Sequence, residues 1–343
     1  MNVDLQQKFA GIGAVLKVDD ATKAIVIESP LPGSPALKAG LRSGDKIIEV
    51  NDGPVAPFLA NAVKQLRGPA GSVVMLGIQR AGNENLIRLK VVRDTVQIAS
   101  VRGYRFKPDQ TWDFMFDDEK KIGYIHLTQV GFRSPEEMET ALNTLNGLGM
   151  KGLILDLRSN PGGSLDQAVS VADLFVSSGR IVTVKGRNGE KAYNATPKGA
   201  PADFPMAVLV NRHTASAAEI ITACLQDNHR AIIVGERTFG QALVRTIVPL
   251  KGGVGSLKIP IAAYYRPNGK AVNRYPDSKD SDDWGVKPDA GYELSFSDEE
   301  LKAFLIFRSQ RDKIKNVEAT ENEFQDHQLQ KASEYLQAQL TKK

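Results

Sequence analysis

Residues 205–245 constrain the fold of this chain more than any other part of the sequence. Two short apolar runs, Met206–Val210 and residues 231–234, have the length and composition of strands buried in a parallel sheet. Between them, residues 219–225 have the pattern of a helix that opens just after Ser216. A serine at such a junction lies beside unpaired backbone N–H groups and the positive end of the helix dipole. This arrangement suits an attacking hydroxyl or the oxyanion that it generates.

A second interpretation is that Thr214 or Ser216 is only the N-cap of this helix, since serine and threonine are common caps. The preceding stretch LILDLRSNPGGS favours a site, because glycines after a strand let backbone N–H groups point into the space above the sheet. Asp156 and Arg158, at the end of that strand, can pair and orient their neighbours. The alternative for this pair is a plain structural salt bridge.

Composition excludes several classes of function. The 343 residues, 42% hydrophobic and 24% charged, suffice for two domains of an ordinary globular protein. The net charge of +4 comes from scattered basic residues, which gives no support for a nucleic-acid partner. The single cysteine, Cys224, cannot form an intrachain disulfide and is expected to be a packed core thiol. The four histidines lack metal-binding spacing, so we expect no metal site and no cofactor.

The cellular location of the protein cannot be read from the N-terminal residues. No apolar stretch is long enough to span a bilayer, and MNVDLQQKFAGIG lacks the apolar core of a secretion signal. Met1 leads almost at once into what resembles a domain interior, which indicates a trimmed form of a longer protein.

The pattern of apolar and polar residues changes along the chain and divides it into four segments. These are a β-rich unit (1–95), a polar, turn-rich connector (96–121), an α/β core (122–296) and a helical, charged extension (297–343). In the first unit we expect strands at 9–14, 24–28, 46–50, 73–79 and 86–92, with helices at 35–39 and 60–66. In the core we expect strands at 122–127, 152–156, 181–184, 256–265 and 291–296, with helices at 135–148 and 165–176. The last helices are expected to be packing or dimer elements. The fold class is therefore α/β, or α+β overall, with a mostly parallel sheet in the core.

The run S-P-A-x-x-A-G-L-x-x-G-D-x-I-x-x-V-N, which begins at Ser34, resembles a PDZ domain. The resemblance implies that Gly11, Ile12, Gly13 and Ala14 form a carboxylate-binding loop that captures the C-termini of peptides or proteins. The alternative is a generic small β-barrel whose glycines only make turns.

Three further motifs, D-L-R-x-N-P-G-G, V-N-x-x-T-A-S-A-A-E-I and G-E-R-T-F-G, occur in the order found in the carboxyl-terminal processing proteases, or tail-specific proteases. The resemblance runs from Gly11 to about Glu293 and implies a PDZ domain joined to a crotonase-like serine protease core, usually in the bacterial cell envelope. It makes Ser216 the nucleophile. The other residues to which it gives a role are Gly162 or Gly163 with the N–H of Ala217 as the oxyanion hole, Asp156, Arg158 and Glu219 as supporting groups, and Asp227 as a further acidic position.

The sequence departs from this family at the general base. The family uses a Ser–Lys dyad, with the lysine in F-G-K-G-x-V-Q, and here that position is Gln241. Ala242 and Arg245 replace the glycine and the glutamine that follow. A glutamine amide has no useful basicity, so the Ser–Lys mechanism cannot operate here as it does in the family.

Three explanations of Gln241 remain. His213 is another candidate base, although a surface polar role suits its position better, whereas Arg245 stays protonated and is a poor base. A deliberate replacement of the lysine is a second explanation, but the simultaneous changes at Ala242 and Arg245 resemble natural divergence. The third is a pseudoprotease that binds chain ends as a scaffold without cutting them.

Overall fold

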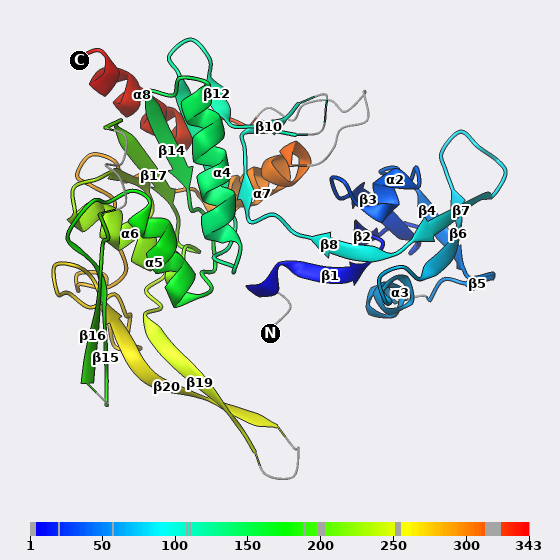
Figure 1. Ribbon diagram of the computed structural model, residues 1–343, viewed down its shortest axis with the longest axis horizontal. Coiled ribbons are helices and arrows are strands. Elements are labelled where there is room, and N and C mark those ends of the chain that lie inside the picture. Colours follow the sequence, from blue (N-terminus) through cyan, green and yellow to red (C-terminus); the bar gives the residue numbers. More distant parts are fainter. Residues whose placement is uncertain are drawn as a thin grey trace.

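The structure is a computed structural model that describes residues 5–19, 21–56, 58–107, 109, 111–187, 189–197, 203–250, 255–312 and 324–342. A β-rich body and a larger α/β body are joined by a ribbon of two antiparallel strands, β1 (Lys8–Gly11) and β8 (Asp94–Gln97) (Figure 1). No helix in these described ranges has both the length and the apolar character needed to cross a membrane.

The β-rich body is an antiparallel sheet with strand order β2-β3-β4-β6-β7, and β5 pairs with β4. Its edge strand is β2, Ala14–Val18. Apolar residues of β2, β3, β4, β6 and β7 pack together in a hydrophobic core that belongs to this body alone. The helix α2 (Pro35–Lys38), expected at 35–39, begins at a proline and is capped by Ser34. The remaining elements are β3 (Ile25–Pro30), β4 (Lys46–Val50), β5 (Gly53–Pro54), α3 (Leu59–Leu66), β6 (Val73–Gln79) and β7 (Ile87–Val92).

The core contains a sheet with strand order β12-β13-β14-β17-β18, to which β9 adds beside β13. The pairings of β13 with β14, of β14 with β17 and of β17 with β18 are parallel, which confirms the expected sheet. On β17, Val208 and Val210 face the helices α4, α5 and α6, whereas Ala207 and Leu209 face α8. These strands are therefore apolar on both faces. The bounds are β9 (Val101–Arg102), β12 (Met115–Asp117), β13 (Ile122–Leu127), α4 (Ser134–Gly147), β14 (Gly152–Asp156), α5 (Leu165–Asp173), β17 (Met206–Val210), α6 (Ala217–Asp227), β18 (Ile232–Gly235) and α8 (His327–Leu340).

The core also contains a second, antiparallel sheet. Some of its strands were expected in the parallel sheet, and others were not predicted from the sequence. The strand expected at 181–184 is β15 (Arg180–Gly186), and it belongs to an antiparallel sheet of order β16-β15-β20-β19, so its place in the parallel sheet was wrong. The hairpin of β19 (Leu243–Pro249) and β20 (Ser256–Tyr265) projects from the core (Figure 1). β16 (Gly189–Asn194) pairs with the other side of β15.

Three further expectations need adjustment. Residues 291–296 form no named strand, since only an isolated bridge joins Glu293 to Gly235. The connector contributes β9 and β12 to the core sheet, together with a small pair, β10 (Arg105–Phe106) and β11 (Trp112–Asp113). The last helix, α8, packs its apolar side on the parallel sheet, so within the described structure it is a packing element. The preceding helix, α7, spans Asp298–Arg311.

Candidate functional site

Three loops meet beyond the carboxyl ends of β14, β17 and β18. Ser216 lies on the second loop, directly before α6, and is half-buried. Its φ of 56° lies in the left-handed region, which a side chain other than glycine rarely adopts and which costs about 1–3 kcal/mol. Strain of this kind clusters at functional sites, so it favours a site over a plain cap.

Thr214 holds this loop in place and does not cap the helix. Its buried hydroxyl donates to the carbonyl of Leu157, 2.8 Å away, and accepts the N–H of Asn211 at 3.0 Å. The Asn211 side chain in turn accepts the N–H of Ser159 at 2.8 Å. The loops after β14 and β17 are therefore bound to each other. Asn211 was not among the residues predicted from the sequence, although its place in the V-N-x-x-T motif was a signal.

The carboxylate of Glu219 links the start of α6 to the third loop. Its Oε2 accepts the N–H groups of Ser216 at 2.9 Å and of Gln241 at 2.8 Å. Its Oε1 accepts the Gly240 N–H at 2.7 Å and the Thr238 hydroxyl at 2.5 Å. One oxygen atom therefore holds the serine and the residue at the expected base position side by side.

Glu219 is fully buried, and this burial raises the pKa of its carboxyl group, although the four hydrogen bonds oppose the increase. Thr238 also accepts the N–H of Val286 at 2.8 Å, so a more distant loop supports the same carboxylate. Thr238 was not among the residues predicted from the sequence. Its only signal was the G-E-R-T-F-G motif.

The two glycines of the first loop lie directly against the serine. A Cβ atom added to Gly162, whose φ is +89°, would lie 2.8 Å from the Cβ of Ser216 and 2.7 Å from the nitrogen of Ala217. A Cβ on Gly163, whose φ is +152°, would lie 2.0 Å from the carbonyl oxygen of Val130. Only glycine fits at these two positions, because the backbones of neighbouring segments are in contact there.

The N–H groups around the serine are not equivalent. The Gly162 N–H donates to the side chain of Asn160 at 2.8 Å. Among the residues that the structure describes, the N–H groups of Gly163 and Ala217 have no acceptor. The loop thus leaves two free backbone donors beside Ser216, which is the arrangement that binds an oxyanion.

No side chain in the described part of the chain is hydrogen-bonded to the Ser216 hydroxyl. Gln241 is half-buried and held through its backbone. His213 is exposed, in agreement with a surface polar role, and its backbone N–H donates to the side chain of Asn211 at 3.1 Å. Arg245 is exposed on β19.

Asp156 and Arg158 lie in a buried cluster whose contacts lead away from the serine. Asp156 accepts from Arg158 and from Arg308 of α7, each at 2.7 Å, and from the hydroxyl of Tyr124, also at 2.7 Å. Arg158 also reaches Asp326, the N-cap of α8, at 2.8 Å. Burial favours the neutral form of Asp156, but the two arginines outweigh it and hold its pKa well below the usual range. This cluster fastens both C-terminal helices to the end of β14.

Asp227 lies at the opposite end of α6 from Ser216. It forms an ion pair with Arg266 at 2.5 Å, and its Oδ2 accepts the backbone N–H of Asn268 at 3.3 Å. These contacts close the turn after β20. The structure therefore does not bring Asp227 together with the serine.

The expected peptide-binding loop, Gly11 to Ala14, lies at the start of the edge strand β2. The carbonyl of Ile12 accepts the Ala36 N–H at 2.7 Å and that of Gly13 accepts the Leu31 N–H at 2.9 Å. These bonds fix the loop against α2, because its carbonyl groups point inward. The expected strand over 9–14 was wrong in this detail, since β1 ends at Gly11 and β2 begins at Ala14.

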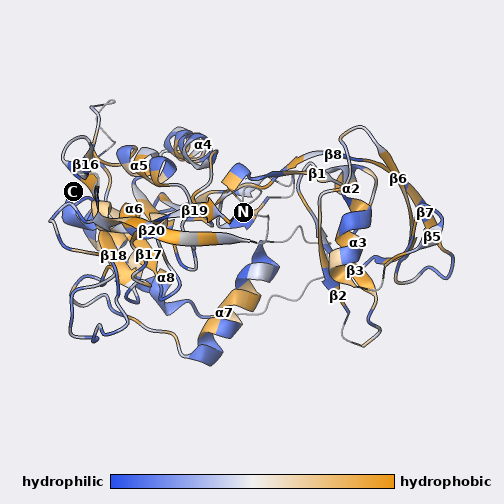
Figure 2. Cartoon of the chain, turned by 90° about the horizontal axis from the view of Figure 1, so that it is seen from below, coloured by the Kyte–Doolittle hydropathy of each residue, from blue (hydrophilic) through white to orange (hydrophobic). Residues whose placement is uncertain are grey.

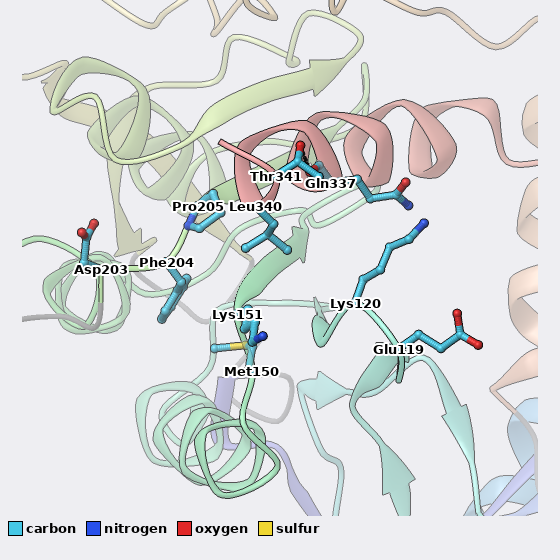
Figure 3. Close-up of a pocket in the computed structure, with 10 residues that line it drawn as sticks. All are labelled: Glu119, Lys120, Met150, Lys151, Asp203, Phe204, Pro205, Gln337, Leu340 and Thr341. Carbon is cyan, nitrogen blue, oxygen red and sulfur yellow. Dashed lines mark hydrogen bonds between the residues drawn. The ribbon is translucent and has the colours of Figure 1, made fainter. Parts of the chain in front are cut away.

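A pocket of about 660 Å³ opens at the other end of the core (Figure 3). It is lined by Met150 and Lys151, just before β14, by Pro205, just before β17, and by Leu340 of α8. These residues mark the amino ends of the parallel strands, whereas Ser216 and the glycines follow the carboxyl ends. In open α/β sheets catalytic groups gather at the carboxyl ends. The pocket is therefore separate from the serine site.

The described residues contain no group of three or more His, Cys, Asp or Glu side chains that could hold a metal ion.

Comparisons with known proteins give the same domain order. The sequence profile of the PDZ domain matches residues 2–79, and that of peptidase family S41 matches residues 121–291. A putative S41 protease from Bacteroides fragilis has a similar fold, with a TM-score of 0.52 and 19% sequence identity over 88% of this chain and 79% of that chain.

Two curated relatives share more of the sequence. The carboxy-terminal-processing protease of Bartonella bacilliformis is 33% identical over 354 residues, which cover 97% of this chain and 76% of that protein. The carboxy-terminal processing protease CtpA of Bacillus subtilis is 35% identical over 292 residues, which cover 84% of this chain and 57% of that protein. The chain thus spans between about half and three quarters of the length of these relatives.

Proposed function

Because the chain belongs to the carboxy-terminal-processing serine proteases of peptidase family S41, with a PDZ domain before the protease core, we propose that it is an endopeptidase that cleaves by acyl transfer at Ser216. The single observation that carries the proposal is the Glu219 carboxylate, which holds the serine beside the loop of Gln241. Its substrates are proteins with exposed C-termini. The envelope location implied by the family resemblance remains an expectation.

In the proposed reaction the Ser216 hydroxyl attacks the scissile carbonyl group and loses its proton to water. The peptide C–N bond then breaks, the amine leaves with a proton taken from water, and a further water molecule hydrolyses the acyl ester on Ser216. The N–H groups of Gly163 and Ala217 donate to the oxyanion that forms, a contribution typically worth about 2.7–4 kcal/mol for one donor. Gly162 has a different role, because its own N–H is bound by Asn160. It lets the loop approach Ser216 closely enough for Gly163 to reach the oxyanion.

The site lacks a suitable group to remove the proton from the Ser216 hydroxyl. A glutamine amide at position 241 cannot accept the hydroxyl proton, and His213 is exposed and has no hydrogen bond to the serine. An oxyanion hole without a general base still accelerates hydrolysis, but only by a small part of the full catalytic effect. We therefore propose slow turnover.

Replacement of the nucleophile tests the proposal. Wild-type protein incubated with an unfolded substrate that has an apolar C-terminus is expected to release fragments slowly, and Ser216→Ala is expected to release none. Fragment formation is measured by mass spectrometry over hours. Equal cleavage by both proteins would rule out acyl transfer at Ser216.

A second candidate function is a scaffold that binds C-terminal peptides without cutting them, and Gln241 is the observation that favours it. In that case wild type and Ser216→Ala both leave the substrate intact while both still bind the tail peptide. The same incubation, followed by a binding measurement on each protein, separates the two functions.

The proposed receptor for chain ends is the loop from Gly11 to Ala14. Gly13 has a φ of +75°, and a Cβ there would lie 2.5 Å from the Cβ of Ser34, so Gly13→Ala must distort the loop. We expect this variant to weaken the binding of a tail peptide about tenfold, as measured by fluorescence anisotropy. Gly53→Ala is the matched control, since it lies in the same domain outside this loop and its added Cβ has no neighbour closer than 3.7 Å. Unchanged affinity of a folded Gly13→Ala protein would place the receptor elsewhere.

Asp156, Arg158 and Asp227 have supporting roles in this proposal, at a distance from the reacting atoms. The first two fix the end of β14, and with it the loop that carries the glycines. A homo-oligomer formed through the C-terminal helices remains an expectation from the sequence.

A further inference from the structure

The helix α7 has two apolar faces, and the core uses only one of them. Phe304 and Arg308 are buried, with 1% and 6% of their surface exposed. Farther round the helix Leu305 is 43% exposed and Ile306 is 45% exposed. The exposed face turns away from the α/β core.

This exposed face forms one wall of a groove of about 590 Å³, and the other wall is the PDZ sheet. Lys17 of β2 and Glu28 of β3 line the PDZ side. Figure 2 shows α7 between the core and these two strands. The α7 side is lined by residues at the spacing of a single helical face, namely 298, 301, 302, 305, 306, 309 and 310.

The groove is continuous with the peptide-binding edge of the PDZ domain. A chain end held at residues 11–14 would add as a strand to β2, whose outer edge has no partner strand in the described sheet. With its carboxylate at the start of β2, the tail must run antiparallel to this strand, so that its residues lie beside Ala14 at the carboxyl end and progressively nearer to Val18 with distance from that end. It passes Lys17, which lines the groove, after about four residues.

Side chains of an added strand alternate between the two faces of the sheet. Half of them lie on the side of Val15 and Lys17, both of which are exposed. Lys17 is the residue that β2 contributes to the groove, so this is the side on which α7 lies. Some residues of the tail pair with β2, and the residues that precede them in the tail therefore come close to Leu305 and Ile306.

We propose that the exposed face of α7 is a second subsite for the substrate tail, selective for an apolar side chain about five to seven residues before the carboxyl end. The proposal rests on the proposed capture of chain ends by the loop at residues 11–14. The centre of the groove is apolar, with Leu301 beside Leu305 and Ile306. The charged residues that line the groove include both acidic and basic side chains. An apolar side chain therefore fits the groove better than a charged one.

The test compares two tail peptides that share their last four residues. One has about four residues and the other about ten, with leucine at the sixth position from the end. We expect the longer peptide to bind the wild-type protein about tenfold more tightly, because apolar surface is buried on α7. The double variant Leu305→Ser/Ile306→Ser is expected to remove this gain and to leave the affinity of the short peptide unchanged. Leu148→Ser, which alters a leucine that is 46% exposed on another surface, is the matched control.

Three results would overturn the proposal. The first is equal affinity of the two peptides for the wild-type protein. The second is a double variant that weakens both peptides alike, which would mean that the face acts through docking of the PDZ domain onto α7. The third is a photo-crosslinker at the sixth position of the longer peptide that labels no residue of α7. Failure of the short peptide to bind, with crosslinks still found on α7, would count against the proposed loop receptor and not against the subsite.

Discussion

Gln241→Lys is expected to increase the rate of peptide hydrolysis by about 10²–10⁴-fold, the range that a positioned general base supplies. The backbone of residue 241 is already fixed, because its N–H is bound to the Glu219 oxygen that also holds Ser216. A lysine there begins beside the serine in a half-buried position, where partial desolvation lowers the pKa of an amine. The rate is measured with a quenched fluorescent peptide, and it should rise with pH as the lysine loses its proton.

Gln241→Arg is the matched control for this gain. It introduces the same charge on a side chain that stays protonated, so the rate should remain at the wild-type level. The triple variant Gln241→Lys/Ala242→Gly/Arg245→Gln restores the family pattern around the base and is expected to be at least as active. If neither lysine variant gains activity while both remain folded, the pocket around the serine has lost more than its base, or the alignment of position 241 is wrong.

Glu219→Ala is expected to reduce the free energy of unfolding by about 4 kcal/mol, the cost of removing one partner from a buried, hydrogen-bonded charge site. The substitution leaves four donors without an acceptor, namely the N–H groups of Ser216, Gly240 and Gln241 and the hydroxyl of Thr238. Denaturant unfolding followed by circular dichroism measures the loss. Glu137→Ala offers a contrast, because this carboxylate binds residues 100 and 101 in the connector and its loss leaves the serine loops intact. A Glu219→Ala protein of wild-type stability would contradict this account of the site.

The same carboxyl group predicts a pH dependence of stability. Burial raises the pKa of Glu219 in the folded protein, so the folded state holds this proton at a pH where the unfolded chain has lost it. Its contribution is therefore fully present below the ordinary carboxyl pKa, and stability declines as the pH rises through the elevated pKa. Glu219→Gln removes the titration and should flatten that part of the curve of unfolding free energy against pH.

The sequence predicted the strands and helices that hold the site because their signals are local. The doubly buried strands β13, β14 and β17 are continuous apolar runs, and Gly162 and Gly163 follow one of them at a turn. The antiparallel sheet of β15, β16, β19 and β20 could not be read in the same way. The pairing that joins its two hairpins, β15 with β20, connects strands that lie far apart in the sequence, and β19 alternates too weakly to be distinguished from a loop.

The hydrogen-bond network around Glu219 could not be predicted from the sequence either. A glutamate three residues after a serine is a common feature of a helix start, and it satisfies the capping pattern without any contact to a distant loop. Only the fold shows that Thr238, Gly240 and Gln241 bring their donors to the same group. The arginine cluster around Asp156 could not be predicted for the same reason. Arg308 and Asp326 lie far from Asp156 in sequence and reach the cluster only through the packing of α7 and α8.

The ribbon of β1 and β8 determines how the PDZ domain can move. A pair of hydrogen-bonded strands bends across its flat face but resists stretching and shear, so the domain is expected to swing along an arc on this hinge. The root of the hinge is held by Gln7, a fully buried residue whose side chain accepts the N–H of Arg133 at 2.9 Å. Val130, three residues earlier, donates its own N–H to the carbonyl of Gly162 at 2.9 Å. Any swing that pulls on Gln7 therefore acts, through the few residues between Arg133 and Val130, on the turn of Gly162 and Gly163 that carries the proposed oxyanion donor.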